Sequence, residues 1–127
     1  MTIRPYTAAD QAAMFAMLRE EGDEWADYWG EAGCELYAQK LLEGFVLVAY
    51  DKGELCGYVS ARDDHGFEVV VYDLLVRPFY RGKCIGRALL DGVVAAFPGK
   101  GIYVMSDADG YYEKQGYQKA GTLFEVK

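Results

Sequence analysis

The residues best suited to chemistry lie in a basic, glycine-rich turn within VRPFYRGKCIGRALL, residues Val76–Leu90. This segment follows a strand-like run and leads into an amphipathic helix. The residues of the turn that suggest binding are Arg81, Gly82, Lys83 and Gly86. The start of a helix leaves backbone N–H groups unpaired, and such groups bind anions. The sequence therefore predicts an anion site suited to a phosphate or a diphosphate.

Length and composition limit the class of protein. The chain has 127 residues, enough for one domain, and its 52% hydrophobic and 26% charged residues are typical of a soluble globular protein. No apolar run approaches the roughly 20 residues that span a bilayer, and the N-terminus lacks a signal-peptide pattern. We therefore expect a single cytoplasmic domain over residues 1–127, with no membrane partner.

Charge and metal-ligand counts exclude other classes. Twenty acidic and 13 basic side chains give a net charge of −7, which argues against nucleic acid and is compatible with a cationic partner or with solubility alone. The chain has one histidine, His65, and three widely spaced cysteines, Cys34, Cys56 and Cys84. We therefore expect free thiols and no metal site.

The pattern of elements predicts an α/β (α+β) domain with a mostly antiparallel start and a βαβ unit late in the chain. Strands are expected over residues 2–6, 45–50, 55–62, 67–76 and 102–105, with one or two more within Tyr117–Val126. Helices are expected over residues 8–20, 23–43, 85–97 and 108–115, the second of them broken near Gly30 and Gly33.

The turn resembles the acyl-CoA signature of the GNAT family (Gcn5-related N-acetyltransferases), which reads Q/R-x-x-G-x-G/A. The aligned residues are Arg81, Gly82, Lys83, Cys84, Ile85 and Gly86. Cys84 departs from the pattern, because the family usually has its first glycine there. A second segment, ADGYYEKQGY at Ala108–Tyr117, resembles the family element A-x-x-F-Y-E-K-x-G-F/Y. The two motifs occur in the expected order and at the expected separation. The alternative, that the turn is an ordinary loop without a binding role, is therefore less favoured.

The resemblance implies a GNAT-like domain whose sheet is twisted, mixed and mostly antiparallel, with six or seven strands splayed between the fourth and fifth and about four helices. It also implies acetyl-CoA as cosubstrate, with the diphosphate held by the backbone amides of Arg81–Arg87. The side chains of Arg81, Lys83 and Arg87 would add positive charge. The pantetheine arm would pair with Leu74, Leu75 and Val76, and the N–H of Leu75 or Val76 would stabilise the oxyanion.

Two catalytic residues follow from the same resemblance. Tyr112 matches the family tyrosine that protonates the leaving thiolate, although a core or rim position is an alternative. Some members place a glutamate at the position of Val70, which cannot accept a proton. We expect Asp73 to serve as base, with Glu68 or a water chain as alternatives, although both carboxylates could simply be surface groups. Alternation puts Asp73 on the face opposite Val70 and Glu68 unless a bulge re-aims it.

The acceptor side is expected in the segment Arg19–Tyr37, where carboxylates alternate with aromatic residues. The residues expected to contact the acceptor are Glu24, Trp25, Tyr28 and Trp29. Carboxylates and aromatic faces suit a cationic amine, such as a polyamine, an amino sugar, or a lysine or N-terminal amine. The alternative is a charged outer face with Trp25 and Trp29 packed inward.

These expectations lead to an N-acetyltransferase that transfers an acetyl group from acetyl-CoA to a primary amine. Because Val70 and Cys84 depart from the family pattern, a non-catalytic acyl-CoA-binding or sensor domain is a second hypothesis, and an unrelated interaction module is a third. Cys84 is either an oxidisable thiol, able to form a mixed disulfide with CoA, or a packed and inert one. A homodimer is possible.

Overall fold

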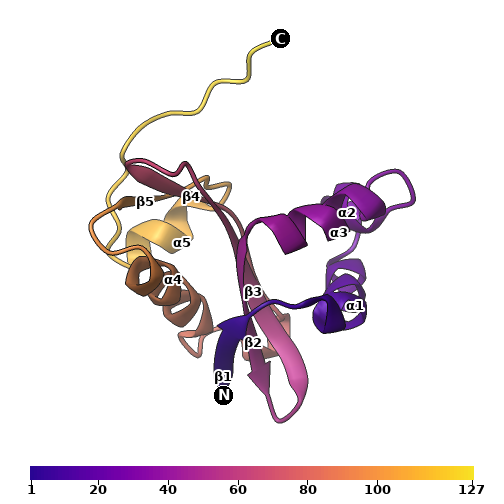
Figure 1. The fold of residues 1–127 in the computed structure, drawn as a ribbon. Helices are drawn as coiled ribbons and strands as arrows, with labels where there is room; N and C mark the ends of the chain where they lie inside the picture. The colour runs from indigo at the N-terminus through magenta and orange to yellow at the C-terminus, as the bar shows by residue number, and fades with distance from the viewer.

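One five-stranded sheet organises the chain, in the order β1-β2-β3-β4-β5 (Figure 1). The strands are β1 (Thr2–Pro5), β2 (Phe45–Asp51), β3 (Glu54–Asp63), β4 (Glu68–Val76) and β5 (Gly101–Val104). The pairs from β1 to β4 are antiparallel, and β4 pairs with β5 in parallel. The computed structural model describes residues 1–127.

Helices cover both faces of this sheet. They are α1 (Gln11–Glu21), α2 (Ala26–Trp29), α3 (Cys34–Glu43), α4 (Ile85–Ala96) and α5 (Asp109–Lys114), with short 3₁₀ turns at Ala8–Asp10, Asp23–Trp25 and Pro78–Tyr80. Helices α1, α2 and α3 lie on one face, and α4 and α5 lie on the other (Figure 1). None of the helices is both long and apolar enough to cross a bilayer.

The sheet separates two apolar layers, and β2 contributes buried side chains to both of them. Side chains alternate across a strand, so Val46 and Val48 pack with α1 and α3, while Leu47 and Ala49 pack with α4. Both sets are buried. This explains why β2 is an almost continuous apolar run rather than an alternation of apolar and polar residues.

The predicted fold class is confirmed, but the predicted number of strands is wrong. The structure has five strands rather than six or seven, because Tyr117–Val126 forms none. Beyond Tyr117 the backbone makes no hydrogen bond, and the segment extends away from the body (Figure 1). The predicted helical region from residue 23 to residue 43 divides near Gly30 and Gly33 as expected, which gives five α-helices rather than about four.

A buried carboxylate fixes the start of the chain against the sheet. Asp10 accepts hydrogen bonds from the Arg4 guanidinium at 2.7 and 2.9 Å, from the Thr7 N–H at 2.8 Å and from the Tyr50 hydroxyl at 2.8 Å. The hydrogen bond from Arg4 is the main reason that the pKa of Asp10 lies well below its ordinary value. The network joins β1, the turn before α1, and β2, and thereby sets where α1 begins.

Replacing Asp10 with asparagine is expected to lower the free energy of unfolding by about 2 kcal/mol, because the charged hydrogen bonds are lost. A lowered folded-state pKa stabilises the protein above the unfolded pKa of about 4, and this contribution disappears as the pH falls further. Urea unfolding from pH 7 to pH 3 should therefore show the difference between wild type and Asp10→Asn shrinking below about pH 4. The exposed Asp91→Asn is the control, and an equal loss in both variants would contradict this role.

Candidate active site

One extra residue in β4 shapes the centre of the candidate site. Val71 and Asp73 pair with adjacent residues of β3, so Tyr72 between them has no partner and forms a bulge. Without the bulge, Asp73 would share the face of Val71, which packs against α4. With it, Asp73 lies on the α1–α3 face and contacts tyrosines from α2 and α3. The alternative carboxylate, Glu68, is exposed at the other end of β4.

The sheet opens directly after this bulge. Pairing between β4 and β5 reaches Val71, whose carbonyl accepts the N–H of Met105 at 2.9 Å, and no pairing continues beyond it. The N–H of Arg77 donates to β3 at 2.8 Å. Strand alternation from that bond turns the backbone groups of Leu74 and Val76 away from β3, toward the open side. Of the two predicted oxyanion donors, Val76 therefore faces the cleft and Leu75 faces β3.

The predicted anion cradle is a run of free backbone donors. No N–H group from Gly82 to Arg87 donates to another group of the chain. Gly82 and Cys84 have φ of 77° and 63°, and this left-handed backbone leads into α4 at Ile85. Successive N–H groups in such a turn form an anion-binding concavity at a helix N-terminus. The backbone is thus suited to a diphosphate.

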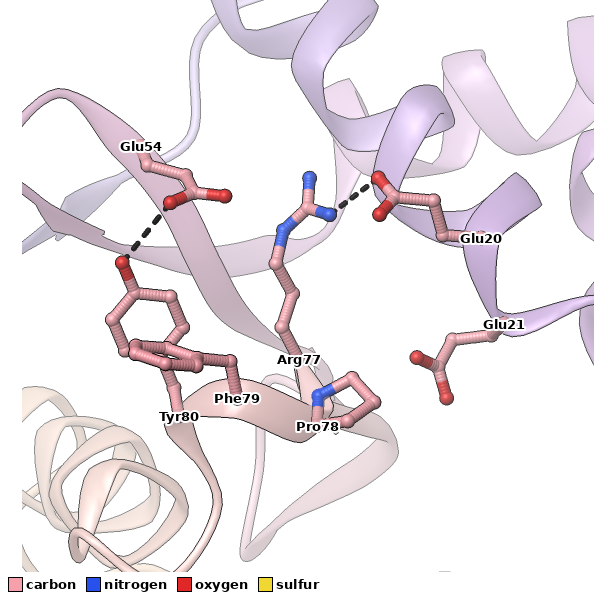
Figure 2. A pocket seen from close by; sticks show the side chains of 7 residues that line it. All are labelled: Glu20, Glu21, Glu54, Arg77, Pro78, Phe79 and Tyr80. Carbon is pink, nitrogen blue, oxygen red and sulfur yellow. Dashed lines mark hydrogen bonds and ion pairs between the residues drawn. The ribbon is translucent and has the colours of Figure 1, made fainter.

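Two arginines of this region tie the turn to α1. Arg77 forms an ion pair with Glu20 (Figure 2), and Arg81 forms one with Glu21 at 2.9 Å. Arg81, predicted to face the diphosphate, is therefore directed toward α1 instead. The cavity beside these pairs measures about 430 Å³ and also contains Glu54. Because it holds three carboxylates and one arginine, it does not suit a phosphate group.

The other two predicted cations flank the cradle. Lys83 places its Nζ 4.6 Å from the centre of the Phe79 ring and forms no ion pair, so it remains available to an anion. Arg87 donates to the carbonyl of Gln115 at 2.9 Å and joins α4 to the end of α5. The cradle therefore relies on backbone amides, with Lys83 as the adjacent free charge.

Gly86 brings α5 close to the cradle. A Cβ at this position would clash with the hydroxyl of Tyr111 and would contact Leu74 at 3.8 Å. Glycine at position 86 thus lets the α5 tyrosine, the start of α4 and the open stretch of β4 approach one another.

A second cavity, of about 190 Å³, lies where Asp73 emerges from β4. Its lining residues come from the α2 region, β4 and the loop before α5, and they are Glu24, Trp25, Asp27, Tyr28, Asp73 and Asp107. Three of the four predicted acceptor residues are therefore present. The fourth, Trp29, is not, because its Nε1 donates to the carbonyl of Gly22 at 3.0 Å and its ring packs on the core.

Asp73 is held by a group of tyrosines. Tyr28 donates to its Oδ1 at 2.7 Å and Tyr37 donates to its Oδ2 at 2.9 Å. Burial raises the pKa of Asp73, and the Asp107 carboxylate adds to the rise, although the two tyrosine hydrogen bonds oppose it. A buried carboxylate with a raised pKa beside a cavity is a candidate proton acceptor.

Sequence reasoning missed several of these residues. The sequence indicates Tyr37 only as the last residue of the expected acceptor segment, and the tyrosine behind it, Tyr58, only as part of an expected strand. Asp107 precedes α5 in a loop and matches no motif. Nothing in the local sequence indicates that these three side chains approach Asp73. No group of three or more metal-ligating side chains in the structure could hold a metal ion.

Tyr112 is half-buried on α5, packed beside Tyr111 with a ring-centroid distance of 5.1 Å. Its hydroxyl makes no hydrogen bond within the chain and is free to meet a ligand. Burial, with smaller contributions from Tyr111 and Asp107, raises the pKa of Tyr112 to about 12. The phenol therefore stays protonated at neutral pH and has a proton to donate.

A sequence profile described as "Acetyltransferase (GNAT) family" matches residues 11–117. The chain belongs to the GNAT acetyltransferase family. The match includes both motifs on which the resemblance was based, Arg81–Gly86 and Ala108–Tyr117.

Individual relatives are distant from this GNAT chain. It is 26% identical over 145 residues to an L-methionine sulfoximine/L-methionine sulfone acetyltransferase of Pseudomonas paraeruginosa, covering 98% of this chain and 84% of that protein. It is 30% identical over 70 residues to the chloroplastic GCN5-related N-acetyltransferase 2 of Arabidopsis thaliana, covering 51% of this chain but only 27% of the plant protein. The crystal structure of an aminoglycoside acetyltransferase from an uncultured soil sample shares the fold, with a TM-score of 0.74 at 24% identity, covering 99% of this chain and 97% of that one.

Cys84 is the irregular position of this GNAT turn. Its side chain is exposed, so the alternative of a packed thiol is wrong. Its φ of 63° lies in the left-handed region that favours glycine. A side chain in this region costs about 1 kcal/mol that glycine does not.

We expect Cys84→Gly to raise the free energy of unfolding by about 0.5–1 kcal/mol by relieving this strain. CoA binding, measured by calorimetry, should be retained or tightened because the free N–H groups remain. Cys84→Ala is the matched control, since it removes the thiol and keeps the Cβ. Equal stability of the two variants in urea unfolding would contradict backbone strain at this position.

Proposed function

We propose that the protein is an N-acetyltransferase that transfers an acetyl group from acetyl-CoA to a primary amine of a small, cationic acceptor. The observation that carries the proposal is the arrangement along β4. The open strand segment from Leu74 to Val76 has the free N–H run of Gly82–Arg87 near one end and the acidic, aromatic cavity of Asp73 at the other. A donor lying along this segment would deliver its thioester to the acceptor cavity.

The donor half of the proposal is supported by the residues that fit CoA. The free amides suit the diphosphate, and Lys83 adds a nearby positive charge. The backbone groups of Leu74 and Val76 face the cleft, where pantetheine amides would find partners. Of these two cleft-facing groups, the N–H of Leu74 lies next to Asp73, so Leu74 rather than Val76 is the candidate oxyanion donor at the thioester end.

The acceptor half is supported by charge. The cavity has four carboxylates and two aromatic side chains in its wall, and no lysine or arginine. An ammonium group gains from both features, whereas an acceptor carboxylate would have no cation to pair with. The acceptor in the name of the aminoglycoside acetyltransferase is a cationic amino sugar, and we propose the same broad class for this chain, with polyamines included.

The chemistry follows from direct attack. Asp73 accepts a proton from the bound ammonium, and the neutral nitrogen attacks the thioester carbonyl carbon. The resulting oxyanion receives a hydrogen bond from the Leu74 N–H, next to Asp73. When the tetrahedral intermediate collapses, the C–S bond breaks and Tyr112 protonates the departing thiolate. The attacking nitrogen releases its second proton to solvent, which leaves the neutral amide. Tyr112, now a phenolate, regains a proton from solvent.

Tyr112→Phe should lower kcat about 100-fold, because the thiolate leaves without an acid. Thiol release from acetyl-CoA with a panel of polyamines, aminoglycosides and peptides measures this effect. Tyr111→Phe is the matched control, since it removes the neighbouring hydroxyl. Both variants should bind CoA like wild type in calorimetry. Full activity of Tyr112→Phe would eliminate the acid role.

The same panel separates the competing functions. CoA binding without turnover on any amine would favour the non-catalytic acyl-CoA-binding or sensor domain. The absence of CoA binding would contradict both proposals. Amino acids are added to the panel as uncharged-side-chain acceptors, and turnover on them but not on polycations would contradict the cationic acceptor and leave the donor assignment intact.

Asp73→Asn should lower kcat about 100-fold by removing the base. Its matched control is Glu68→Gln, which neutralises the exposed carboxylate at the other end of β4 and should retain full activity. Burial raises the pKa of Asp73. As the pH is lowered, the base should therefore become protonated, and wild-type activity should fall, at a pH above the ordinary carboxyl range. Comparable rates for Asp73→Asn and wild type would assign the base elsewhere.

A further inference from the structure

A chain of buried hydroxyl groups lies behind Asp73. Tyr58 on β3 is fully buried, Tyr37 on α3 is 5% exposed and Asp73 is 9% exposed. The Tyr58 and Tyr37 oxygens are 2.7 Å apart, and Tyr37 lies 2.9 Å from Oδ2 of Asp73. Tyr37 also stacks on Tyr28, with ring centroids 3.9 Å apart and planes at 3°.

The number of hydroxyl hydrogens determines which group donates each hydrogen bond between Tyr58, Tyr37 and Asp73. Each tyrosine hydroxyl carries one hydrogen. When Asp73 is ionised, the Tyr37 hydroxyl donates its only hydrogen bond to Oδ2. The hydrogen bond between the two tyrosines must then be donated by Tyr58 and accepted by Tyr37. Tyr58 has no other hydrogen-bond partner. The ionised carboxylate therefore completes an arrangement in which every buried hydroxyl hydrogen has an acceptor.

A proton on Oδ2 would reverse this chain at a cost. The carboxyl group would donate to Tyr37, Tyr37 would donate to Tyr58, and the hydrogen of Tyr58 would lose its acceptor in a dry environment. An orphaned buried donor is strongly disfavoured. Protonation of Oδ1 avoids this, because the chain on Oδ2 stays intact and the partner of Oδ1 is Tyr28, which lines the cavity.

We propose that Tyr37 and Tyr58 are positioning residues that fix the Asp73 carboxylate and direct the proton it accepts onto Oδ1, the oxygen held by the cavity residue Tyr28. The proposal rests on the proposed function, in which Asp73 is the base. It assigns a role to two tyrosines that contact the reacting groups only through Asp73. The pairing also explains why a phenol, rather than an apolar residue, occupies the fully buried position on β3.

The other groups around Asp73 set the background for its titration. They are Tyr28 from α2, Tyr37 and Lys40 from α3, Tyr58 from β3 and Asp107 from the loop before α5. Lys40 favours the ionised form and Asp107 disfavours it. A change at Tyr37 leaves both of these charges in place, so the effect of the hydroxyl can be isolated.

The test is a titration of Asp73 by carbon-13 NMR on protein labelled at the aspartate carboxyl carbons, with the signal assigned by its loss in Asp73→Asn. Tyr37→Phe removes a hydrogen bond to the ionised form and should raise the pKa of Asp73 by about one unit. Tyr58→Phe leaves that bond in place but makes Tyr37 a weaker donor, so the rise should be smaller. Tyr72→Phe, an exposed tyrosine beside Asp73, should cause no shift.

Activity gives the second readout. The acid limb of kcat/KM should move to higher pH in Tyr37→Phe by the same amount as the NMR midpoint, a change that a purely structural role would not produce. If Tyr37→Phe folds poorly because Tyr58 is left without an acceptor, the double variant Tyr37→Phe/Tyr58→Phe has no orphaned hydroxyl and serves the same test.

An unchanged Asp73 midpoint in folded Tyr37→Phe would overturn the proposal, as would a shifted midpoint with an unmoved acid limb in an active enzyme. The NMR result does not depend on turnover. If the midpoint shifts as expected but wild type acetylates no amine, the hydroxyl chain stands and the proposed function fails.

Discussion

A single unpaired residue, Tyr72, determines which way the second half of β4 faces. Before it, Val71 packs toward α4; after it, Asp73 lies among the tyrosines of the opposite face. The same insertion changes which backbone groups face β3. As a result, the N–H and C=O groups of Leu74 and Val76 point toward the open side of β4. The proposed proton acceptor and the strand edge proposed to bind the donor therefore depend on one irregularity. Removing the bulge would bury Asp73 among apolar side chains and turn Leu75 toward the cleft.

The two ends of the site use different electrostatics. At the donor end, backbone amides of Gly82–Arg87 supply the positive potential, while Arg81 and Arg87 are engaged with α1 and α5. Fixed amide dipoles need no reorganisation to meet an anion. At the acceptor end, carboxylates provide a negative field in an aromatic wall. A chain with net charge −7 can thus bind a polyanion locally and attract a cation broadly.

What the sequence could predict depends on local chemistry. A glycine-rich turn before a helix determines its own N–H pattern, so the cradle could be identified from residues 81–86. The contact of Tyr37 with Asp73 could not, because it joins residues far apart in the chain and depends on how α3 packs on a bulged strand. Asp107 lies in a loop with no periodicity. The strands expected within Tyr117–Val126 followed from residue type alone, but a strand also needs an edge to pair with, and this segment pairs with none.

The ion pairs of Arg77 with Glu20 and of Arg81 with Glu21 join the donor turn to the last residues of α1. The chain continues from there into the segment that carries Tyr28, so the proposed donor turn and the proposed acceptor wall are both anchored at the end of α1. A ligand that displaced the turn would act on the acceptor wall, and thermodynamic linkage makes that influence mutual. Because one side chain of each pair, Glu20 and Arg81, is largely exposed to solvent, dissolved salt weakens both pairs. Ionic strength would therefore tune the cooperativity between donor and acceptor while leaving the backbone cradle unaffected.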